Sequence, residues 1–264
     1  MTRRIEKKFE SLKKERKKAL VLFMTAGDPS LEKNEALIHS FEKEGVDLVE
    51  LGVPFSDPLA DGPVIQAASY RSLRRGTNLR KILGLVERVR KRSEIPLLLM
   101  SYLNPVWHYG LERFAREAEK AGVDGLIFPD LPPDEGKEAS ALFERFGIDL
   151  VYLLAPTSAL KRQKLVARSS GGFIYYVSVT GVTGARSVLP DAAQVIRRIK
   201  READLPVCVG FGVSTPRQAK RMSQAADGVI VGSAIVKALA EHPDLPAKAF
   251  CRRYVRPFAR ALGK

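Results

Sequence analysis

The stretch LVELGVPFSDPLADGP, residues 48–63, begins as a buried strand and ends as a loop that carries carboxylates. Glu50 lies inside the apolar run, and Asp57 and Asp61 follow just beyond it. Acidic residues at the end of a buried strand indicate either a structural ion pair or the edge of an active site. The rest of the chain has to distinguish between these two interpretations.

Eight apolar runs, including this one, alternate with charged stretches along the chain. They occupy residues 19–27, 46–54, 96–104, 125–130, 149–156, 173–181, 206–212 and 228–234. Nearly continuous hydrophobicity is typical of parallel strands that are buried on both faces. The stretches between the runs carry apolar residues at helical spacing, as in residues 31–45 and 111–122. This alternation predicts βαβ units and a parallel sheet.

Eight such units in 264 residues favour a closed (β/α)₈ TIM barrel. An open doubly wound sheet stays the alternative, because the periodicity of the sequence does not show whether the sheet closes into a barrel.

The wide gap between the second and third runs predicts an extra helix near residues 64–75. Ile5, Phe9 and Leu12 lie on one stripe, which predicts an additional amphipathic helix at the N-terminus. No linker-like segment interrupts residues 1–264, so we expect a single domain.

The formal net charge of +14 raises the possibility of nucleic-acid binding. The basic residues are spread over several helical stretches, however, and acids alternate with many of them. Such runs are typical of solvated helix faces, so we expect no nucleic-acid partner. A basic surface also attracts a small anionic substrate. Charge alone does not choose between these partners.

Cysteine and histidine usage points away from a metal site. Cys208 and Cys251 fit no metal-ligand spacing, and His39, His108 and His242 are scattered, so we predict no metal.

No apolar stretch approaches the roughly 20 residues needed to span a bilayer. The basic N-terminus is not followed by the apolar region of a signal peptide. We therefore expect a cytoplasmic protein that does not associate with membranes.

The position of Glu50 within its strand carries more information. Side chains alternate across a strand, so Leu48 and Glu50 share one face while Val49 and Leu51 share the other. The wholly apolar face should pack on helices, which leaves Glu50 pointing into the barrel. A carboxyl group there loses hydration, and its pKa rises unless a cation pairs with it. A buried glutamate held by an arginine or lysine stays the alternative at this point.

Glycine-rich loops follow the last three runs. GFGVST (210–215) and VGSAIVK (231–237) each pass from a strand through glycine into an expected helix start, and GVTGAR (181–186) follows the sixth run. Backbone N–H groups at a helix start attract an anion, and glycine lets a phosphate approach closely. Any one of these glycines can be an ordinary turn residue. Two in consecutive loops at the end of a barrel favour a phosphate site.

Five motifs closely resemble the α subunit of tryptophan synthase, and they occur in order along nearly the whole chain. They are FMTAGDP (23–29), ELGVPFSDPLADGPVIQ (50–66), VSVTGVTGAR (177–186), GFGVS (210–214) and VGSAIV (231–236). The resemblance implies a (β/α)₈ barrel that cleaves indole-3-glycerol phosphate to indole and glyceraldehyde 3-phosphate by a retro-aldol reaction. It also implies that a β subunit condenses the indole with serine to give tryptophan.

The resemblance further implies which residues form the site. Glu50 and Asp61 would be the catalytic carboxylates, with no metal and no cofactor in this chain. Among the substrate-binding residues, Tyr175 would line the site beside these acids. The others would be Phe23, Leu99 and Ile127 around the indole ring, and Gly184, Gly212, Gly232 and Ser233 around the phosphate. A barrel enzyme for another phosphorylated substrate stays an alternative. A basic RNA-binding protein is a second alternative, but it leaves the paired acids unexplained.

The last expectations concern motion and assembly. Residues 178–190 are rich in glycine and small polar side chains, which predicts a mobile lid after the sixth strand. The resemblance implies delivery of indole into a pyridoxal-phosphate β subunit within an αββα tetramer. The loops 54–58, 104–110 and 130–135 offer prolines, Trp107 and acids, a composition that suits the docking surface for that subunit.

Overall fold

The computed structural model describes residues 3–177, 188–210 and 212–264. Nine short strands are present in these ranges: β1 Ala19–Thr25, β2 Leu48–Gly52, β3 Leu97–Met100, β4 Gly125–Ile127, β5 Asp149–Val151, β6 Leu153–Leu154, β7 Ile174–Val177, β8 Val207–Gly210 and β9 Gly228–Val231. Each predicted apolar run contains at least one of them.

Helices connect the strands. They are α1 Arg4–Lys14, α2 Leu31–Lys43, α3 Pro63–Arg74, α4 Leu79–Arg90, α5 Leu103–Tyr109, α6 Leu111–Ala121, α7 Lys137–Arg145, α8 Leu160–Ser169, α9 Val188–Glu202, α10 Pro216–Ser223, α11 Ser233–Glu241, α12 Ala247–Phe250, the π-helical turn η1 Cys251–Val255 and α13 Arg256–Ala261. Within the described ranges, none of these helices combines the length and the apolarity required to cross a bilayer.

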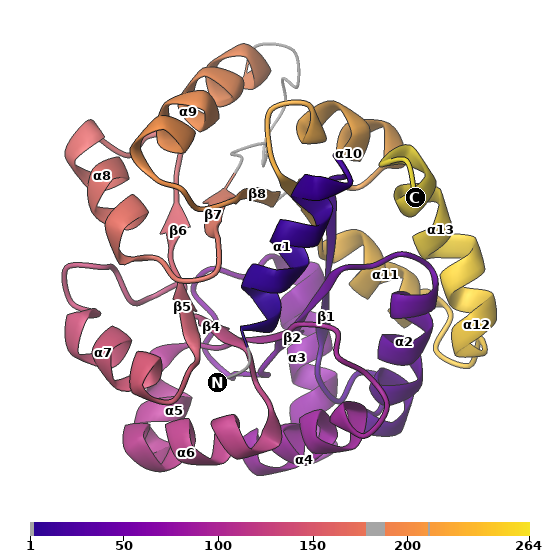
Figure 1. Ribbon diagram of the computed structural model, residues 1–264. Helices are drawn as coiled ribbons and strands as arrows, with labels where there is room; N and C mark the ends of the chain where they lie inside the picture. Colours follow the sequence, from indigo (N-terminus) through magenta and orange to yellow (C-terminus); the bar gives the residue numbers. More distant parts are fainter. Residues whose placement is uncertain (1–2, 178–187, 211) are drawn as a thin grey trace.

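The strands form one parallel sheet in the order β5-β4-β3-β2-β1-β9-β8-β7-β6. The two strands at the ends of this order, β5 and β6, are separated in sequence only by Tyr152. They are one interrupted strand, which pairs with β4 before the interruption and with β7 after it. The sheet therefore curls into a barrel, and helices surround it (Figure 1). The predicted (β/α)₈ barrel is confirmed.

The barrel has two apolar layers, one on each face of the sheet. Val49 and Leu51 of β2 belong to the large cluster between the strands and the outer helices. Leu48 belongs to a smaller cluster inside the barrel, together with residues of the other strands. This confirms the alternation expected for β2, and it places Glu50 on the inner face with Leu48.

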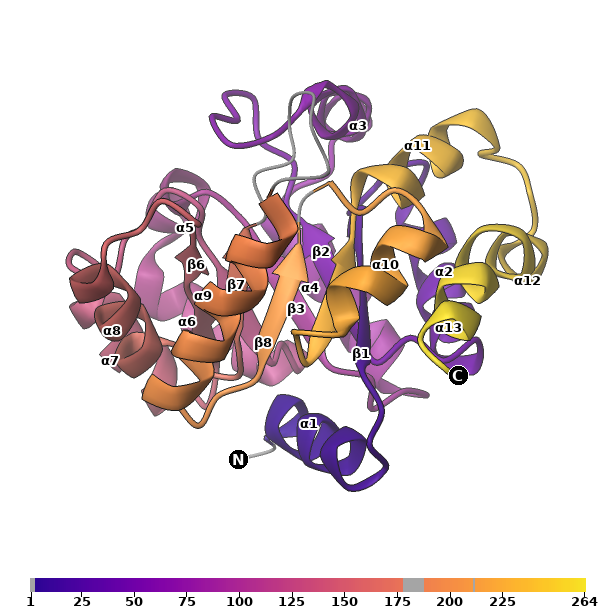
Figure 2. The same cartoon turned by 90° about the horizontal axis from the view of Figure 1, so that it is seen from above.

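Helix α1 closes the end of the barrel at which the strands begin (Figure 2). Its buried residues Ile5, Phe9 and Leu12 belong to the inner cluster, and the rings of Phe9 and Phe173 lie 5.9 Å apart. Burying one such side chain stabilises the fold by about 1.5–3 kcal/mol. The predicted N-terminal amphipathic helix is confirmed, and its role is to seal the barrel.

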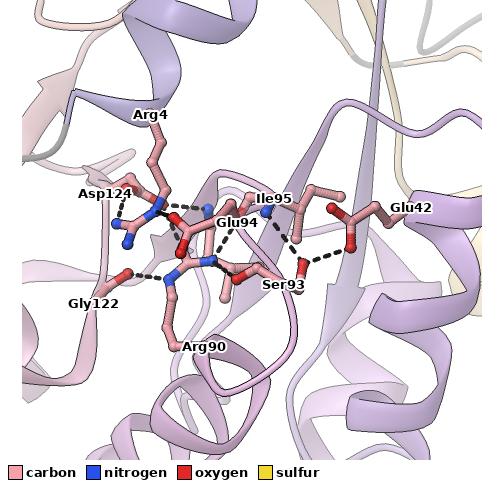
Figure 3. A network of polar contacts seen from close by, with 9 residues as sticks. Arg4, Glu42, Arg90, Ser93, Glu94, Ile95, Gly122 and Asp124 are labelled. Carbon is pink, nitrogen blue, oxygen red and sulfur yellow. Dashed lines mark hydrogen bonds and ion pairs between the residues drawn. The ribbon is translucent and has the colours of Figure 1, made fainter.

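A network of buried polar groups fixes α1 to the barrel (Figure 3). Asp124, just before β4, accepts hydrogen bonds from Arg90 (2.5 Å), from Arg4 of α1 (3.0 Å) and from the backbone N–H of Leu97 (2.8 Å). Arg90 also donates to the carbonyl of Gly122 at 2.8 Å. Asp124 and Arg90 are therefore both paired and hydrogen-bonded at this end of the barrel.

Helix α3 lies at the opposite end of the barrel, above the ends of the strands (Figure 2). It confirms the extra helix expected near residues 64–75. Arg71 of α3 holds the buried carboxylate of Asp28 with two hydrogen bonds of 3.0 and 2.6 Å, which fixes α3 to the loop after β1. The segment from Val53 to Gly62, which carries Asp61, enters α3 from this same end.

Asp124→Ala is expected to destabilise the fold by about 3–5 kcal/mol, because it leaves the charge of Arg90 buried with no carboxylate partner. Glu112→Ala is the matched control, since it removes an exposed ion pair with Arg116 on α6. Urea unfolding of both variants measures the difference. A loss for Asp124→Ala as small as that for the control would contradict a structural role for the network.

Candidate active site

Glu50 is fully buried on the inner face of β2, with an exposed fraction of 0%. Among the residues that the structure describes, neither carboxyl oxygen has a hydrogen-bond partner. No arginine or lysine in those ranges forms an ion pair with it. Burial therefore acts unopposed and raises the pKa of Glu50 to about 8. The interpretation as a structural ion pair fails for the described chain, and the geometry fits a carboxyl that exchanges protons near neutral pH.

Asp61 lies on the segment between β2 and α3, where it is half-buried. It lines a narrow cavity whose other walls include Phe23, Gly52, Met100 and Tyr102. Burial raises the pKa of Asp61, and a hydrogen bond with Tyr102 opposes that rise by favouring the ionised form. Asp61 therefore lies at the C-terminal end of the strands, where barrel enzymes place their active sites.

Two aromatic side chains occupy space that glycines leave open. Phe23 of β1 pairs in register with Glu50, and a Cβ atom at Gly52 would lie 2.5 Å from Phe23 Cζ. A Cβ atom at Gly210 would lie 2.4 Å from the hydroxyl oxygen of Tyr175 on β7. Burial, and then the proximity of Glu50, raises the pKa of Tyr175 well above its ordinary value. Both rings therefore lie within the barrel near the carboxyl group of Glu50.

The structure corrects one expected position. Ile127 lies in the inner cluster, as a wall residue should, but Leu99 lies in the outer cluster and faces the helices. The prediction that Leu99 flanks the indole ring is therefore wrong. Glu50 pairs in register with Leu98, so the inner positions of β3 are Leu98 and Met100. Met100 lines the cavity of Asp61, and counting the alternation of side chains along β3 would have identified it.

Two of the four expected phosphate residues lie at the start of α11. Gly232 is the residue before the helix, and Ser233 is its first residue. The carbonyl of Gly232 accepts from Ile235 and Val236, whereas the first N–H groups of a helix have no partner within it. An anion fits there. A Cβ atom at Gly232 would meet Phe23 only at an ordinary 3.5 Å, so the packing leaves room for one at this position.

The loop after β8 differs from expectation in one respect. Gly212 is exposed, with φ of +77°, a conformation that favours glycine. The expected free helix start behind it is closed, because the N–H groups of Ser214 and Thr215 both donate to Oε1 of Gln218, at 2.9 and 3.0 Å. Gly184 and most of the predicted lid, residues 178–187, lie outside the described residues.

Tyr102 is a site residue that sequence reasoning missed. Its side chain is buried and lines the cavity of Asp61, directly after β3. The only signal in the sequence is an aromatic residue two positions past an apolar strand, and such residues are common in packed cores. Its hydrogen bonds are long-range in sequence, so no local pattern encodes them.

Comparison with known proteins gives one consistent family. The family described as tryptophan synthase alpha chain matches residues 9–261. A tryptophan synthase alpha chain of Geotalea uraniireducens is 55% identical over 239 residues, covering 90% of both chains. The crystal structure of the tryptophan synthase subunit alpha of Legionella pneumophila superposes with a TM-score of 0.91 at 38% identity, covering 100% of this chain and 99% of that one. A tryptophan synthase structure from M. tuberculosis, in an open form, gives 0.88 at 35% identity and covers 99% of both chains.

The fold and the site define a (β/α)₈-barrel enzyme with carboxyl groups at the C-terminal ends of its strands. The chain belongs to the tryptophan synthase alpha chain family, which confirms the resemblance found in its motifs. It is a carbon–carbon lyase of tryptophan biosynthesis, which cleaves indole-3-glycerol phosphate to indole and glyceraldehyde 3-phosphate. Membership of this family implies a β subunit as partner.

Glu50→Gln is expected to remove a pH dependence of stability. An unfolded glutamate has a pKa of about 4.3, whereas that of folded Glu50 is about 8. The folded chain holds this proton more tightly, so the free energy of unfolding of the wild type falls as pH rises from about 4.3 to about 8. The variant is expected to match the wild type near pH 4 and to be more stable by about 5 kcal/mol near pH 9, because each pKa unit corresponds to about 1.4 kcal/mol.

Urea unfolding at a series of pH values measures this difference. Glu112→Gln, an exposed position on α6, is the control and should leave the pH dependence unchanged. Parallel stability curves for Glu50→Gln and the wild type would show that Glu50 ionises as freely in the folded chain as in the unfolded one.

Proposed function

We propose that Glu50 and Asp61 carry out the retro-aldol cleavage in this chain. The observation that carries the proposal is the buried carboxyl of Glu50, which has no hydrogen-bond partner among the described residues and a pKa of about 8. A group with that pKa is partly protonated at neutral pH and can both donate and accept a proton.

The chemistry assigns one task to each acid. Glu50 donates a proton to the indole C3, which places positive charge on the ring nitrogen. The carboxylate of Asp61 binds the indole N–H and stabilises that charge. The hydroxyl on C3′ then loses its proton to the Glu50 carboxylate, a carbonyl forms, and the C3–C3′ bond breaks with its electrons returning to the ring. The products are indole and glyceraldehyde 3-phosphate, and Glu50 ends protonated as it began.

The remaining residues bind the two ends of the substrate. Phe23, Ile127 and Tyr175 are inner-face residues suited to the indole ring, and Met100 takes the place first expected for Leu99. Gly232 and Ser233 at the start of α11, with Gly212 and Gly184, are proposed to bind the phosphate. The start of α11 supports this assignment, because the first N–H groups of a helix have no partner within the helix itself.

The proposed partner is a pyridoxal-phosphate β subunit, in an αββα tetramer in the cytoplasm, with residues 1–264 acting as one domain. Two large apolar side chains support docking at the same end as Asp61: Trp107 on α5 has an exposed fraction of 66%, and Leu59 on the Asp61 segment has 90%. Exposed apolar residues gathered near one site are typical of interfaces. Contact with the Asp61 segment would also order the catalytic carboxylate, so the partner should increase the cleavage rate.

Glu50→Gln and Asp61→Asn are each expected to lower kcat for indole-3-glycerol phosphate by about 10²–10⁴-fold, the range for loss of acid–base or charge stabilisation. The assay measures glyceraldehyde 3-phosphate, with and without added β subunit, and far-ultraviolet circular dichroism checks the fold. Glu112→Gln, on the exposed face of α6, should keep full activity. Wild-type turnover in either variant would remove that residue from the mechanism, and binding of β subunit without faster turnover would contradict the coupling.

Gly232→Val is expected to raise KM for indole-3-glycerol phosphate by about 10–100-fold with little loss of stability. The reason is that its side chain occupies phosphate space, while a Cβ atom there makes only ordinary contacts of 3.5 Å or more with Phe23. Steady-state kinetics and thermal unfolding measure the two effects. Gly84→Val on α4, far from the strand ends, is the control for substitution alone. An unchanged KM would place the phosphate elsewhere.

A further inference from the structure

The segment that carries Asp61 has few attachments to the barrel. Its first residue, Val53, donates its N–H to the carbonyl of Met100 at 2.8 Å. Beyond that point, the N–H of Ala60 donates to the hydroxyl of Tyr102 at 2.8 Å, which ties residues 54–61 to the segment after β3. The other bonds of this segment are local, such as Ser56 to Asp57 and Gln66 to the carbonyl of Asp61.

The ring of Tyr102 holds the other side of the same segment. Its centroid lies 5.3 Å from that of Phe55, with the ring planes tilted by 35°. Tyr102 is only 5% exposed, so the tyrosine side of both contacts is buried, whereas Ala60 itself lies at the surface. One side chain therefore contacts the segment near its beginning and again next to Asp61.

The hydroxyl of Tyr102 has two distinct uses. Its oxygen accepts from the N–H of Ala60, and its proton is free to donate to the carboxylate of Asp61, the hydrogen bond that opposes the rise in the Asp61 pKa. A donor aimed at a carboxylate both fixes its orientation and favours its ionised form. Removal of the hydroxyl therefore affects position and charge together.

The backbone next to Tyr102 is fixed by hydrogen bonds to Asp130. Tyr102 is the residue before α5, and the next N–H, that of Leu103, donates to both carboxylate oxygens of Asp130 at 3.1 Å each. Asp130 is the other acid whose charge acts on the phenol. Because the bonds of Asp130 go to the backbone, they do not depend on the Tyr102 hydroxyl.

We propose that Tyr102 is a positioning residue for Asp61, which anchors the β2–α3 segment through its hydroxyl so that the Asp61 carboxylate faces the substrate. This inference rests on the proposed function, in which Asp61 binds the indole N–H. Tyr102 acts through Asp61 and takes no part in proton transfer.

Tyr102→Phe tests the proposal, since it keeps the ring against Phe55 and removes only the hydroxyl. In the full-length chain, kcat for indole-3-glycerol phosphate should fall by about 10–100-fold, as expected for a lost hydrogen bond to a charged group. The acidic limb of the kcat/KM profile should move to higher pH, because Asp61 loses the donor that favours its ionised form. Tyr152→Phe is the matched control: it removes an equally buried hydroxyl, bonded to Ser140 at 3.1 Å, on the outer face of the barrel.

A double-mutant cycle separates positioning from an independent role. In the Asp61→Asn background, Tyr102→Phe should cost little further activity, since residues that act as a unit are non-additive. Additive losses, or an unmoved acidic limb, would overturn the proposal. Wild-type behaviour of Tyr102→Phe alongside an inactive Asp61→Asn variant would overturn it while leaving the proposed function standing.

Amide hydrogen exchange tests the anchor without using activity. In the wild type, the Ala60 amide should exchange at least about tenfold more slowly than that of its exposed neighbour Leu59. Tyr102→Phe should abolish this difference, and Tyr152→Phe should preserve it. Equal exchange at the two amides of the wild type would overturn the proposal. A wild type that shows slow exchange at Ala60 but no cleavage would instead refute the proposed function and leave the anchor supported.

Discussion

The alternation of side chains along β2 is the constraint on which the site depends. Once the sheet closes, one face of β2 must meet the helices and the other must meet the barrel interior. Val49 and Leu51 occupy the outer face, so the intervening Glu50 has no route to water. A carboxylate in such a place is costly, and the group responds by holding its proton up to a pKa of about 8. The fold itself thus produces an acid–base group for neutral pH, at some expense of stability.

Buried carboxyl groups occur in this barrel in two kinds of environment. At the end sealed by α1, Asp124 is neutralised by Arg4 and Arg90 and accepts a backbone N–H as well. On the inner face of β2, Glu50 is left without a described partner. The first arrangement fixes structure, because breaking a buried pair leaves an uncompensated charge. The second leaves the carboxyl group of Glu50 without a hydrogen-bond partner among the described residues, and burial then raises its pKa.

Much of the fold and part of the site could be predicted from sequence because they follow from local periodicity. The apolar runs contain the strands, and the stripe of Ile5, Phe9 and Leu12 identifies α1. The interruption at Tyr152, which divides one run into β5 and β6, leaves no such pattern. Leu99 was misplaced by one residue, which in a strand exchanges the inner face for the outer one.

The remaining features depend on contacts between residues far apart in the sequence, or on side chains that take backbone N–H groups expected to be free. The loop after β8 reads as a free helix start, but the side chain of Gln218 takes the N–H groups of Ser214 and Thr215. This is a capping box, and Gln three residues after Thr215 was the available signal. The bond from Ala60 to Tyr102 spans 42 residues and is visible only after β2 and β3 have paired. Sequence therefore indicates the acids more readily than the groups that orient them.

The shape of the site comes as much from missing side chains as from those present. Gly52 follows Glu50 at the next inner position of β2, where any Cβ atom would lie within 2.5 Å of the ring of Phe23. Gly210 on β8 plays the same part for Tyr175, whose hydroxyl would lie 2.4 Å from a Cβ atom there. Two glycines in strands, where glycine weakens the sheet, are explained by the rings they admit. These rings exclude water around Glu50, and exclusion of water is what keeps its pKa high. The acidity of the carboxyl group, the apolar surface available to an indole ring and the two strand glycines are therefore consequences of one packing arrangement.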